Sequence, residues 1–556
     1  MGWQHFLSMV VFSVQSSAIK TQKKRINSAL NRASLPKNLS HAMTLSPDTL
    51  HPETQHPDSQ PTETQRPDIQ REQRLNSLLP KLKQLIPAQY IITEVEQLRA
   101  YECDAFTTMR QLPLLTVLPD TIEQVQHVMR CCHQLDIPVV ARGAGTGLTA
   151  GSMPVENGVL LGMSRFDKIY DIDPDNRTAL IGPGVRNLAV TEAAAVHNLY
   201  FAPDPSSQLA CSVGGNVAEN AGGVHCLKYG LTVHNILELE MVTASGELIT
   251  LGSAALDAAG YDLTAILTGS EGLLGIVVRI RVKLLPRAES CRVMLAAFST
   301  IEDAGQAIAA VIGAGIIPAG LEMIDQTGIC AIEELMHAGY PVDAAAVIIC
   351  ELDGGEAEVE DELQQVIQIF RELHATDIQI AENAEQSTRI WAARKAAFPA
   401  LARLAPDNYI MDGTIPRRAL AQVWKQINLL AEQYQLQVVN VFHAGDGNMH
   451  PSILFDSSNE EEHQRAFELG TRILELCIEV GGTISGEHGI GLEKINQMCL
   501  QFNSQELEQF HALKRAFDPK TLLNPGKQIP TLARCAEFNG LHVHNGEMPF
   551  PHLERF

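Results

Sequence analysis

Three histidines and a glutamate stand in two short glycine-rich segments of this 556-residue sequence. His443 and His450 are the two histidines of FHAGDGNMH, and Glu487 and His488 are adjacent in GEHGIG. Two neutral imidazoles and one carboxylate can bind a divalent metal such as zinc or manganese and leave positions open for a substrate. A lone histidine is more often structural, but this combination favours His443, His450 and Glu487 as metal ligands.

Such a site suits the oxidation of a small 2-hydroxy acid. The carboxylate and hydroxyl of the acid can chelate the metal, which lowers the pKa of the hydroxyl. A base then removes that proton while a hydride leaves the α-carbon. His488 is adjacent to a predicted ligand but outside the set, so it is the candidate base; a fourth ligand or a structural histidine is the alternative.

A second kind of site is indicated by the segment RGAGTGL, residues 142–148. Glycines at alternate positions let the backbone approach a phosphate and offer it several N–H donors. Asp167 lies where a dinucleotide-binding fold would place its ribose-binding acid. Gly151, Pro154 and Gly158 leave no room before it for the crossover helix of that fold. The loop therefore predicts a pyrophosphate site without a Rossmann unit, which argues against NAD.

Two more glycine clusters follow, APDPSSQLACSVGGNVAENAGG at 202–223 and LTGSEGLLG at 267–275. Small residues and amides suit a flat ligand that lies against the backbone. Each cluster alone could be a tight structural turn. Because all three lie next to strand-like segments, one large shared cofactor explains them better.

The composition limits the possible partners and compartments. A formal net charge of -23 repels phosphate backbones and anionic lipids, which argues against nucleic acid as a partner. No C-x-x-C pair occurs among the eleven cysteines, which argues against zinc ribbons and iron–sulfur clusters. This usage predicts a reducing compartment, with cysteines acting mainly as small buried apolar residues.

No apolar run is long enough to span a bilayer. The basic cluster at residues 20–25 follows the apolar segment 6–14, whereas a secretory signal has the opposite order. We therefore expect a cytoplasmic protein, at most peripherally attached to a membrane.

The chain is too long for one core, so we expect two main domains. Residues 46–70 are rich in proline and almost free of apolar side chains, which predicts disorder. The expected organisation is a disordered extension at 1–75, a cofactor domain at 76–290, a substrate domain at 291–525 and a tail at 526–556. Apolar periodicity predicts strands at 114–118, 137–140, 275–285, 293–298, 346–351 and 438–442, and helices at 122–129, 301–312 and 356–373. Residues 236–251 are predicted to form strand-like segments around a turn at Ser245-Gly246.

The three glycine-rich segments closely resemble the FAD-binding domain of the vanillyl-alcohol oxidase and p-cresol methylhydroxylase family. The resemblance implies an α+β fold, with a two-part FAD-binding domain and an α/β cap domain built on an antiparallel sheet. Some members tether the flavin through His or Cys near the first loop; residues 142–153 contain neither, which implies non-covalent FAD. The implied cofactor-binding residues are Arg142, Gly143, Ala144, Gly145, Thr146, Gly147, Leu148, Pro203, Asp204, Ser206, Ser212, Gly214, Gly215, Asn216, Gly269, Ser270, Glu271, Gly275 and Asn524.

The histidine segments are similar to those of the D-2-hydroxy-acid dehydrogenase branch of this family. The resemblance places His443, His450 and Glu487 at metal-ligand positions, with His488 as the base that acts while hydride passes to flavin N5. It implies that Arg394 pairs with the substrate carboxylate and that Asn448 contacts the substrate. Phe398 and Ile410 stand where hydroxyglutarate enzymes carry polar groups, which favours a short acid over a dicarboxylate.

From about residue 75 onward the chain resembles the flavin subunits of bacterial glycolate dehydrogenases, also called glycolate oxidases. The shared segments include CDAF, FAPDPSSQ, GGVHCLKYGLTVHN and the terminal HVHNGEMPFPHLERF. This resemblance implies oxidation of glycolate to glyoxylate, with D-lactate as a related substrate. It also implies an iron–sulfur subunit and a second FAD-type subunit as partners, which pass electrons to a membrane quinone.

Three other functions stay open at this point. One is a self-sufficient D-lactate dehydrogenase or an oxygen-using oxidase of the same fold. Another is a silent scaffold that keeps FAD for a partner's chemistry. The third is a non-redox flavoenzyme similar to the ether-lipid synthases. The complete histidine set argues against the last two.

Overall fold

The computed structural model describes residues 67–256, 259–531 and 534–535. Most of the predicted extension and of the tail lies outside this range. The first described element is helix α2 (Pro67–Leu82), which begins with proline, a residue favoured in a first turn. Leu78 and Leu82 are buried, and Arg71 donates to the carbonyls of Pro113 and Leu114. The prediction of disorder up to residue 75 is therefore wrong from Pro67 onward, because this helix has an apolar face to bury.

A small sheet carries the first glycine loop. Its strand order is β1-β2-β4-β3, and β4 pairs in parallel with both β2 and β3. Helix α4 follows β2 and buries Val125, Val128 and Met129 in the same core as this sheet. No helix occupies the described loop between β3 and β4, which agrees with the exclusion of a Rossmann crossover. The bounds are β1 (Ile91–Ile92), β2 (Leu115–Val117), α4 (Ile122–Leu135), β3 (Val139–Arg142) and β4 (Val159–Gly162).

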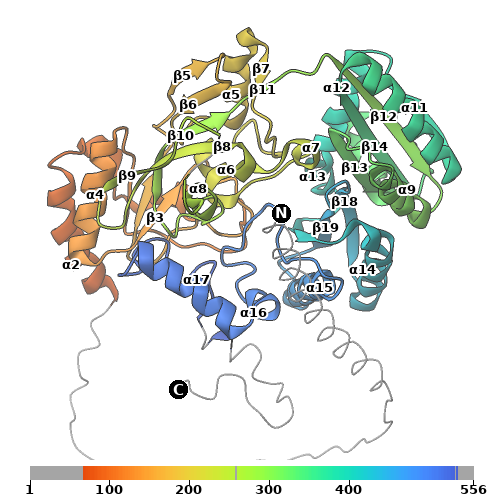
Figure 1. The fold of residues 1–556 in the computed structure, drawn as a ribbon. Coiled ribbons are helices and arrows are strands. Elements are labelled where there is room, and N and C mark those ends of the chain that lie inside the picture. The colour runs from red at the N-terminus through yellow and green to blue at the C-terminus, as the bar shows by residue number, and fades with distance from the viewer. Residues whose placement is uncertain (1–66, 257–258, 532–533, 536–556) are drawn as a thin grey trace, which may run out of the picture. The chain divides into compact units, whose positions relative to one another are not determined.

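A five-stranded antiparallel sheet follows, in the order β5-β6-β10-β8-β9. Buried and half-buried residues alternate along β10, as expected for a strand with one face on a core. The second glycine cluster forms helix α6, capped by Ser212, and leads into α7 (Figure 1). The bounds are β5 (Ile169–Asp173), β6 (Thr178–Ile181), α6 (Val213–Glu219), α7 (Cys226–Tyr229), β8 (Ile236–Val242), β9 (Leu248–Gly252) and β10 (Ile276–Lys283).

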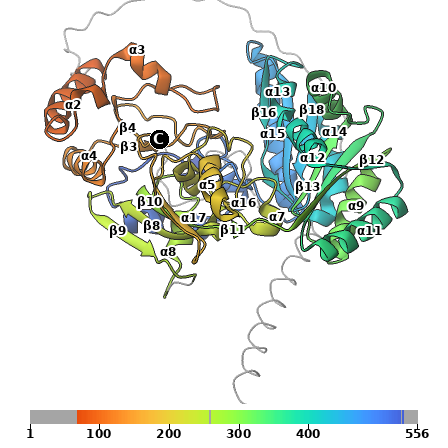
Figure 2. The ribbon, with the colours of Figure 1, turned by 90° about the horizontal axis from the view of Figure 1, so that it is seen from above.

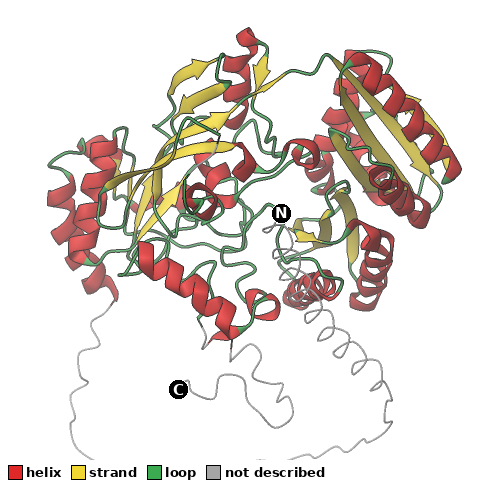
Figure 3. Ribbon diagram, in the orientation of Figure 1, coloured by secondary structure: helices red, strands yellow, loops and turns green. Residues whose placement is uncertain are grey.

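The cap is built on one antiparallel sheet in the order β15-β12-β14-β13-β18-β19-β16. Alternate residues of β12 enter different cores: Met294 packs with helices α9, α11 and α14, and Leu295 packs with α10, α12 and α13. The sheet is therefore covered on both faces by helices (Figure 3). The bounds are β12 (Ser290–Phe298), α9 (Ile301–Gly313), β13 (Gly320–Asp325), α10 (Gln326–Met336), β14 (Ala346–Gly354), α11 (Glu356–Glu372), β15 (Ala375–Ile380), α12 (Ala384–Lys395), α13 (Ala397–Leu401), β16 (Asp407–Ile410), α14 (Leu420–Tyr434), β18 (Gln437–His443), β19 (Asn448–Phe455) and α15 (Glu460–Glu479).

After the cap, the chain returns to the cofactor-binding part. Helix α17 (Ser504–Phe517), blue in both ribbon views (Figures 1 and 2), packs its last residue Phe517 against the core of the five-stranded sheet. Lys514 Nζ donates to the carbonyl of Leu273, and Leu523 forms a parallel bridge with Val139. The last residues of the predicted substrate domain, 291–525, therefore pack on the cofactor-binding part of the molecule.

One cysteine pair departs from the expectation of isolated thiols. Cys499 and Cys535 form a disulfide across a sequence separation of 36. Most other described cysteines are buried, but Cys291 and Cys330 are exposed. The described chain contains no helix with the length and apolar character needed to cross a membrane.

Candidate active site

The three glycine-rich segments and both histidine segments line one cavity of about 530 Å³. The cavity therefore joins the FAD-type loops to the cap. Fifteen of the nineteen predicted cofactor-binding residues line it: Arg142, Gly143, Ala144, Gly145, Thr146, Gly147, Leu148, Ser206, Ser212, Gly214, Gly215, Asn216, Ser270, Glu271 and Gly275.

The other four predicted cofactor residues do not line this cavity. The carbonyl of Pro203 accepts from Asn187, and Asp204 pairs with His225. Gly269 lies on a neighbouring apolar cavity. Asn524 Nδ2 donates to the carbonyls of Gly151 and Glu271, so it supports the loops from behind.

The first loop is held close to its own arginine. Gly145 has φ +72°, and a Cβ there would overlap the guanidinium of Arg142. Arg142 Nη1 donates to the carbonyl of Cys103 at 2.6 Å. Glycine at 145 is therefore required both by its backbone conformation and by the close side chain.

The predicted metal ligands meet at the cap side of the cavity. Glu487 Oε1 lies 3.3 Å from His443 Nε2 and 3.0 Å from His450 Nε2. One ligand atom from each residue lies within 4.8 Å of the others. His450 Nε2 is buried and, although it lies 3.0 Å from Glu487 Oε1, it makes no well-oriented hydrogen bond among the described residues. The donor set and its convergence fit a divalent cation.

The outer ring nitrogens of both histidines are oriented by the protein. His443 Nδ1 lies 2.8 Å from Glu322 Oε1, and His450 Nδ1 lies 3.1 Å from the carbonyl of Met411. Such outer contacts fix the ring of a metal-binding histidine and direct its other nitrogen at the ion. Glu322 was missed in the sequence because it lies on β13, far along the chain, in no motif.

His488 stands next to these ligands. Its ring stacks on His450 with centroids 4.8 Å apart and planes 15° apart. Burial lowers the pKa of His488 to about 4, so the imidazole is neutral near pH 7 and can accept a proton.

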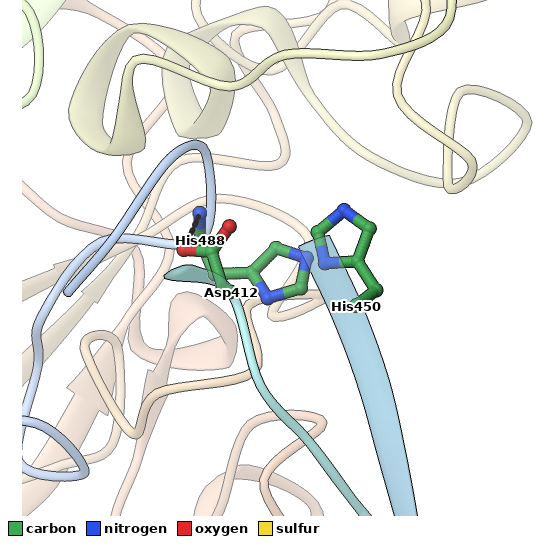
Figure 4. A group of neighbouring side chains, drawn as sticks. All are labelled: Asp412, His450 and His488. Carbon is green, nitrogen blue, oxygen red and sulfur yellow. Dashed lines mark hydrogen bonds between the residues drawn. The ribbon is translucent and has the colours of Figure 1, made fainter. Parts of the chain in front are cut away.

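Asp412 also lies beside His450 and His488 (Figure 4). Its carboxylate accepts from Ser485 Oγ, from the backbone N–H groups of 486–488, and from Lys494 Nζ at 2.9 Å. Although burial opposes the charge, Lys494 is foremost among the nearby cationic groups that keep the pKa of Asp412 well below its usual range. Because its oxygens are occupied, Asp412 organises the 485–494 loop, and sequence spacing alone gave no sign of this role.

Arg394 is buried on α12 and lines the cavity. Its Nη2 lies 2.6 Å from Glu322 Oε2, so one carboxylate holds both Arg394 and His443. Phe398 and Ile410 line the same cavity. The structure thus brings together the predicted carboxylate-binding arginine and the apolar residues expected to limit substrate length.

Asn448 lies behind the cavity wall, next to the 485–494 loop. It is absent from the cavity lining, and its Nδ2 donates to Asp412 Oδ1 at 3.0 Å. A Cβ on Gly486 would overlap this amide, so Asn448 is packed directly under the loop. Asn448 therefore supports that loop, and its contact with a substrate stays a prediction.

Comparison with protein families gives two matches. Residues 113–252 match an FAD binding domain, and residues 287–528 match the C-terminal domain of FAD linked oxidases. Among solved structures, p-cresol methylhydroxylase with substrate bound has a TM-score of 0.71 at 18% identity, with 83% of this chain and 98% of that chain covered. The predicted p-cresol methylhydroxylase-type fold is confirmed.

Several curated proteins are much more similar in sequence. The glycolate oxidase subunit GlcD of Escherichia coli (strain K12) is 58% identical over 494 residues, which cover 87% of this chain and 99% of the relative. GlcD of Bacillus subtilis (strain 168) is 38% identical, covering 78% and 93%. A D-lactate dehydrogenase of Archaeoglobus fulgidus is 33% identical, covering 75% and 92%.

Proposed function

Since this chain belongs to the family of FAD-linked oxidases that includes the glycolate oxidase subunits GlcD, we propose that it oxidises glycolate to glyoxylate. It is an FAD-dependent oxidoreductase that acts on the CH–OH group of a 2-hydroxy acid, with D-lactate as a related substrate. The observation that carries the proposal is the single cavity that joins the FAD-type loops to Arg394 and the histidine cluster.

The fifteen lining residues of the glycine-rich segments would hold FAD without a covalent bond. Bound FAD supplies a two-electron oxidant that can accept a hydride from the α-carbon of the substrate. The protein contributes the backbone N–H groups of these loops and a cavity that residues of the cap also line. Electrostatic interactions with an anionic substrate are stronger there than in bulk water.

We propose that His443, His450 and Glu487 bind a divalent metal, zinc or manganese. The convergence of the three ligand atoms and the contacts that orient both rings support this assignment. Such an ion would polarise the substrate hydroxyl and lower its pKa.

Arg394 and His488 act on different groups of the substrate, the carboxylate and the hydroxyl. The guanidinium of Arg394 would pair with the carboxylate, a contact favoured by its planar donors. Its Nε is buried without a hydrogen-bond partner among the described residues, so a donor is available. His488, neutral at pH 7, takes the hydroxyl proton. Phe398 and Ile410 give this part of the cavity apolar surface, which favours a short acid over a dicarboxylate.

The relatives are named as subunits, so we propose that this chain works within a complex. An iron–sulfur subunit and a second FAD-type subunit would carry electrons onward to a membrane quinone. The chain would then sit at the inner face of the cell membrane through these partners.

A second candidate is a self-sufficient D-lactate dehydrogenase, favoured by the Archaeoglobus fulgidus relative. The isolated chain would then turn over D-lactate faster than glycolate with an artificial dye. Parallel assays with dye and with O₂ also separate a dehydrogenase from an oxidase.

The direct test is an anaerobic titration of the FAD-loaded protein with glycolate, D-lactate, L-lactate and D-2-hydroxyglutarate, followed by flavin absorbance. We expect glycolate and D-lactate to bleach the flavin and the dicarboxylate to fail. His488→Ala should keep FAD bound but slow reduction by about 10²–10⁴-fold. Unchanged reduction in that variant would remove His488 as the base, and full activity after verified metal removal would remove the metal. A colourless protein that cannot be reconstituted with FAD would contradict the whole assignment.

A further inference from the structure

A buried carboxyl group in the cavity has no role in the proposed chemistry. Glu219 is the last residue of α6 and lines the cavity beside the first glycine loop. Its Oε2 is fully enclosed and has no hydrogen-bond partner among the described residues. In the same part of the chain no Lys, Arg or His forms an ion pair with it. An isolated carboxylate in such a position is costly.

Two other acids lie close to Glu219. A Cβ on Gly489 would overlap Glu219 Oε2 and stand 3.0 Å from Glu271 Oε1, so the two carboxyl groups face the same point. On the other side, a Cβ on Gly147 would stand 3.8 Å from Glu219 Oε1 and 3.9 Å from Asp104 Oδ2. Groups of like charge this close do not all ionise.

Of these three acids, Glu271 has the hydrogen bonds that most favour the ionised form. Its two oxygens accept from the backbone N–H groups of Ile490 and Gly491 at 2.7 and 2.8 Å. Asp104 accepts from the N–H groups of Phe106 and Ser152. Such bonds favour the charged form, and Glu219 has none of them. The proton therefore belongs on Glu219.

The cations that face this group are engaged elsewhere. Lys494 is paired with Asp412, and Lys527 donates to the carbonyls of Gly151 and Met153. Arg142 donates to the carbonyl of Cys103. Burial, and then the charges of Glu271 and Asp104, raise the pKa of Glu219 well above its usual range despite these lysines.

We propose that Glu219 is a neutral carboxylic acid that donates a hydrogen bond to bound FAD. This rests on FAD occupying the cavity, as in the proposed function. FAD brings a charged pyrophosphate and several carbonyl and ring-nitrogen acceptors, so a carboxylate here would repel it, whereas an acid O–H offers it a donor. The hydrogen bond adds to the backbone donors of the glycine loops.

Two substitutions of nearly equal size separate the possibilities. Glu219→Gln keeps an N–H donor and carries no charge, whereas Glu219→Met keeps the volume without a donor. Glu192→Met, at an exposed position on α5 (Asn187–Ala194), is the matched control. The measurements are the Kd of FAD for the apo protein by fluorescence titration, and the flavin midpoint potential of each holo protein.

We expect Glu219→Gln and Glu192→Met to bind FAD within about threefold of the unmodified protein, with unchanged potentials. Glu219→Met should weaken binding by about tenfold, the size of one lost hydrogen bond. The Kd of the unmodified protein should not change between pH 6 and pH 8, since a neutral acid stays neutral across that range.

Three outcomes would overturn the proposal. Normal FAD affinity in Glu219→Met would show that the O–H of Glu219 donates its hydrogen bond to Glu271 and not to the cofactor. Tighter FAD binding or a higher potential in Glu219→Gln would show that Glu219 is ionised. If FAD binding by the unmodified protein weakens as the pH rises from 6 to 8, Glu219 ionises in that range and the proposal is wrong. If Glu219→Met does not fold, as judged by circular dichroism, the glutamine variant and the pH series still decide. Failure of the proposed function is distinct, since the unmodified protein would then not bind FAD or not be reduced by glycolate.

Discussion

At the scale of single residues, Asp412 shows how one buried charge can arrange a catalytic loop. Its side chain is fully buried against an equally buried Lys494. It also accepts hydrogen bonds from the backbone N–H groups of Glu487 and His488. The same carboxylate therefore fixes the position of the backbone that carries a proposed metal ligand and the proposed base. Breaking such a pair leaves an uncompensated charge in the interior.

We predict that Asp412→Asn lowers stability by about 3–5 kcal/mol, because Lys494 is then left buried without its partner. Flavin reduction by glycolate should also slow, since the His488 backbone loses its acceptor. Unfolding in urea and stopped-flow flavin absorbance measure the two effects. Asp175→Asn, in an exposed turn, is the control. Adding Lys494→Met to Asp412→Asn should restore part of the stability; if Asp412→Asn alone is as stable as the unmodified protein, the pair does not hold the loop.

At the scale of elements, His225 links the FAD-binding loops to the cap. Its Nδ1 lies 2.9 Å from Asp204 in the second glycine cluster, and its Nε2 lies 3.2 Å from Glu351 on β14. Glu351 also accepts from Trp391 Nε1 on α12, the helix that carries Arg394. One imidazole thus connects three elements around the cavity.

We predict that the stabilising effect of His225 depends on pH. Burial by itself lowers its pKa, but Asp204 and Glu351 outweigh burial and raise the pKa well above 6.5. A raised pKa in the folded state means that the contribution is complete below about pH 6.5 and is lost as the pH rises through the folded-state pKa. His225→Gln should therefore cost about 1–3 kcal/mol at pH 6 and much less at high pH.

Urea unfolding of both proteins across this pH range measures the difference, and His197→Gln, at an exposed position, serves as the control. A deficit that stays constant from pH 6 to pH 10 would mean that the charge of His225 is not involved.

At the scale of the whole molecule, the end of the described chain is fastened in two ways. Leu523 joins the first sheet next to Val139, and Asn524 N donates to the carbonyl of Val139. Cys535 is then joined to Cys499 in α16 (Met498–Gln501). The disulfide closes a loop that includes α17.

We predict that Cys499→Ser destabilises the protein by up to about 4 kcal/mol, the chain-entropy value for a loop of this length. Thermal unfolding with and without reductant measures this, and the variant should no longer respond to reductant. Cys330→Ser, at an exposed free thiol, is the control. A thiol count under denaturing, non-reducing conditions equal to all eleven cysteines would show that the bond does not form.

Much of the fold could be predicted because its signals are local. Strand periodicity at 275–285 and helical spacing at 122–129 reappear as β10 and α4. Pro154 and Gly158 excluded a crossover helix, and the described loop contains none. The start of the ordered chain was less accurate, because the apolar face of α2 packs on surfaces far away in sequence.

For the site, the sequence by itself determined which residue types are available: glycines where a backbone must approach a ligand, and the His443, His450, Glu487 and His488 set. Only the tertiary structure decided which carboxylates form ion pairs with which cationic side chains. Glu322 forms ion pairs with Arg394 and His443, and Asp412 forms one with Lys494. Glu219, in contrast, lies close to the carboxyl group of Glu271 and forms no ion pair among the described residues. The physical reason is that electrostatic pairing depends on distance through space and on burial, and neither follows from separation along the chain.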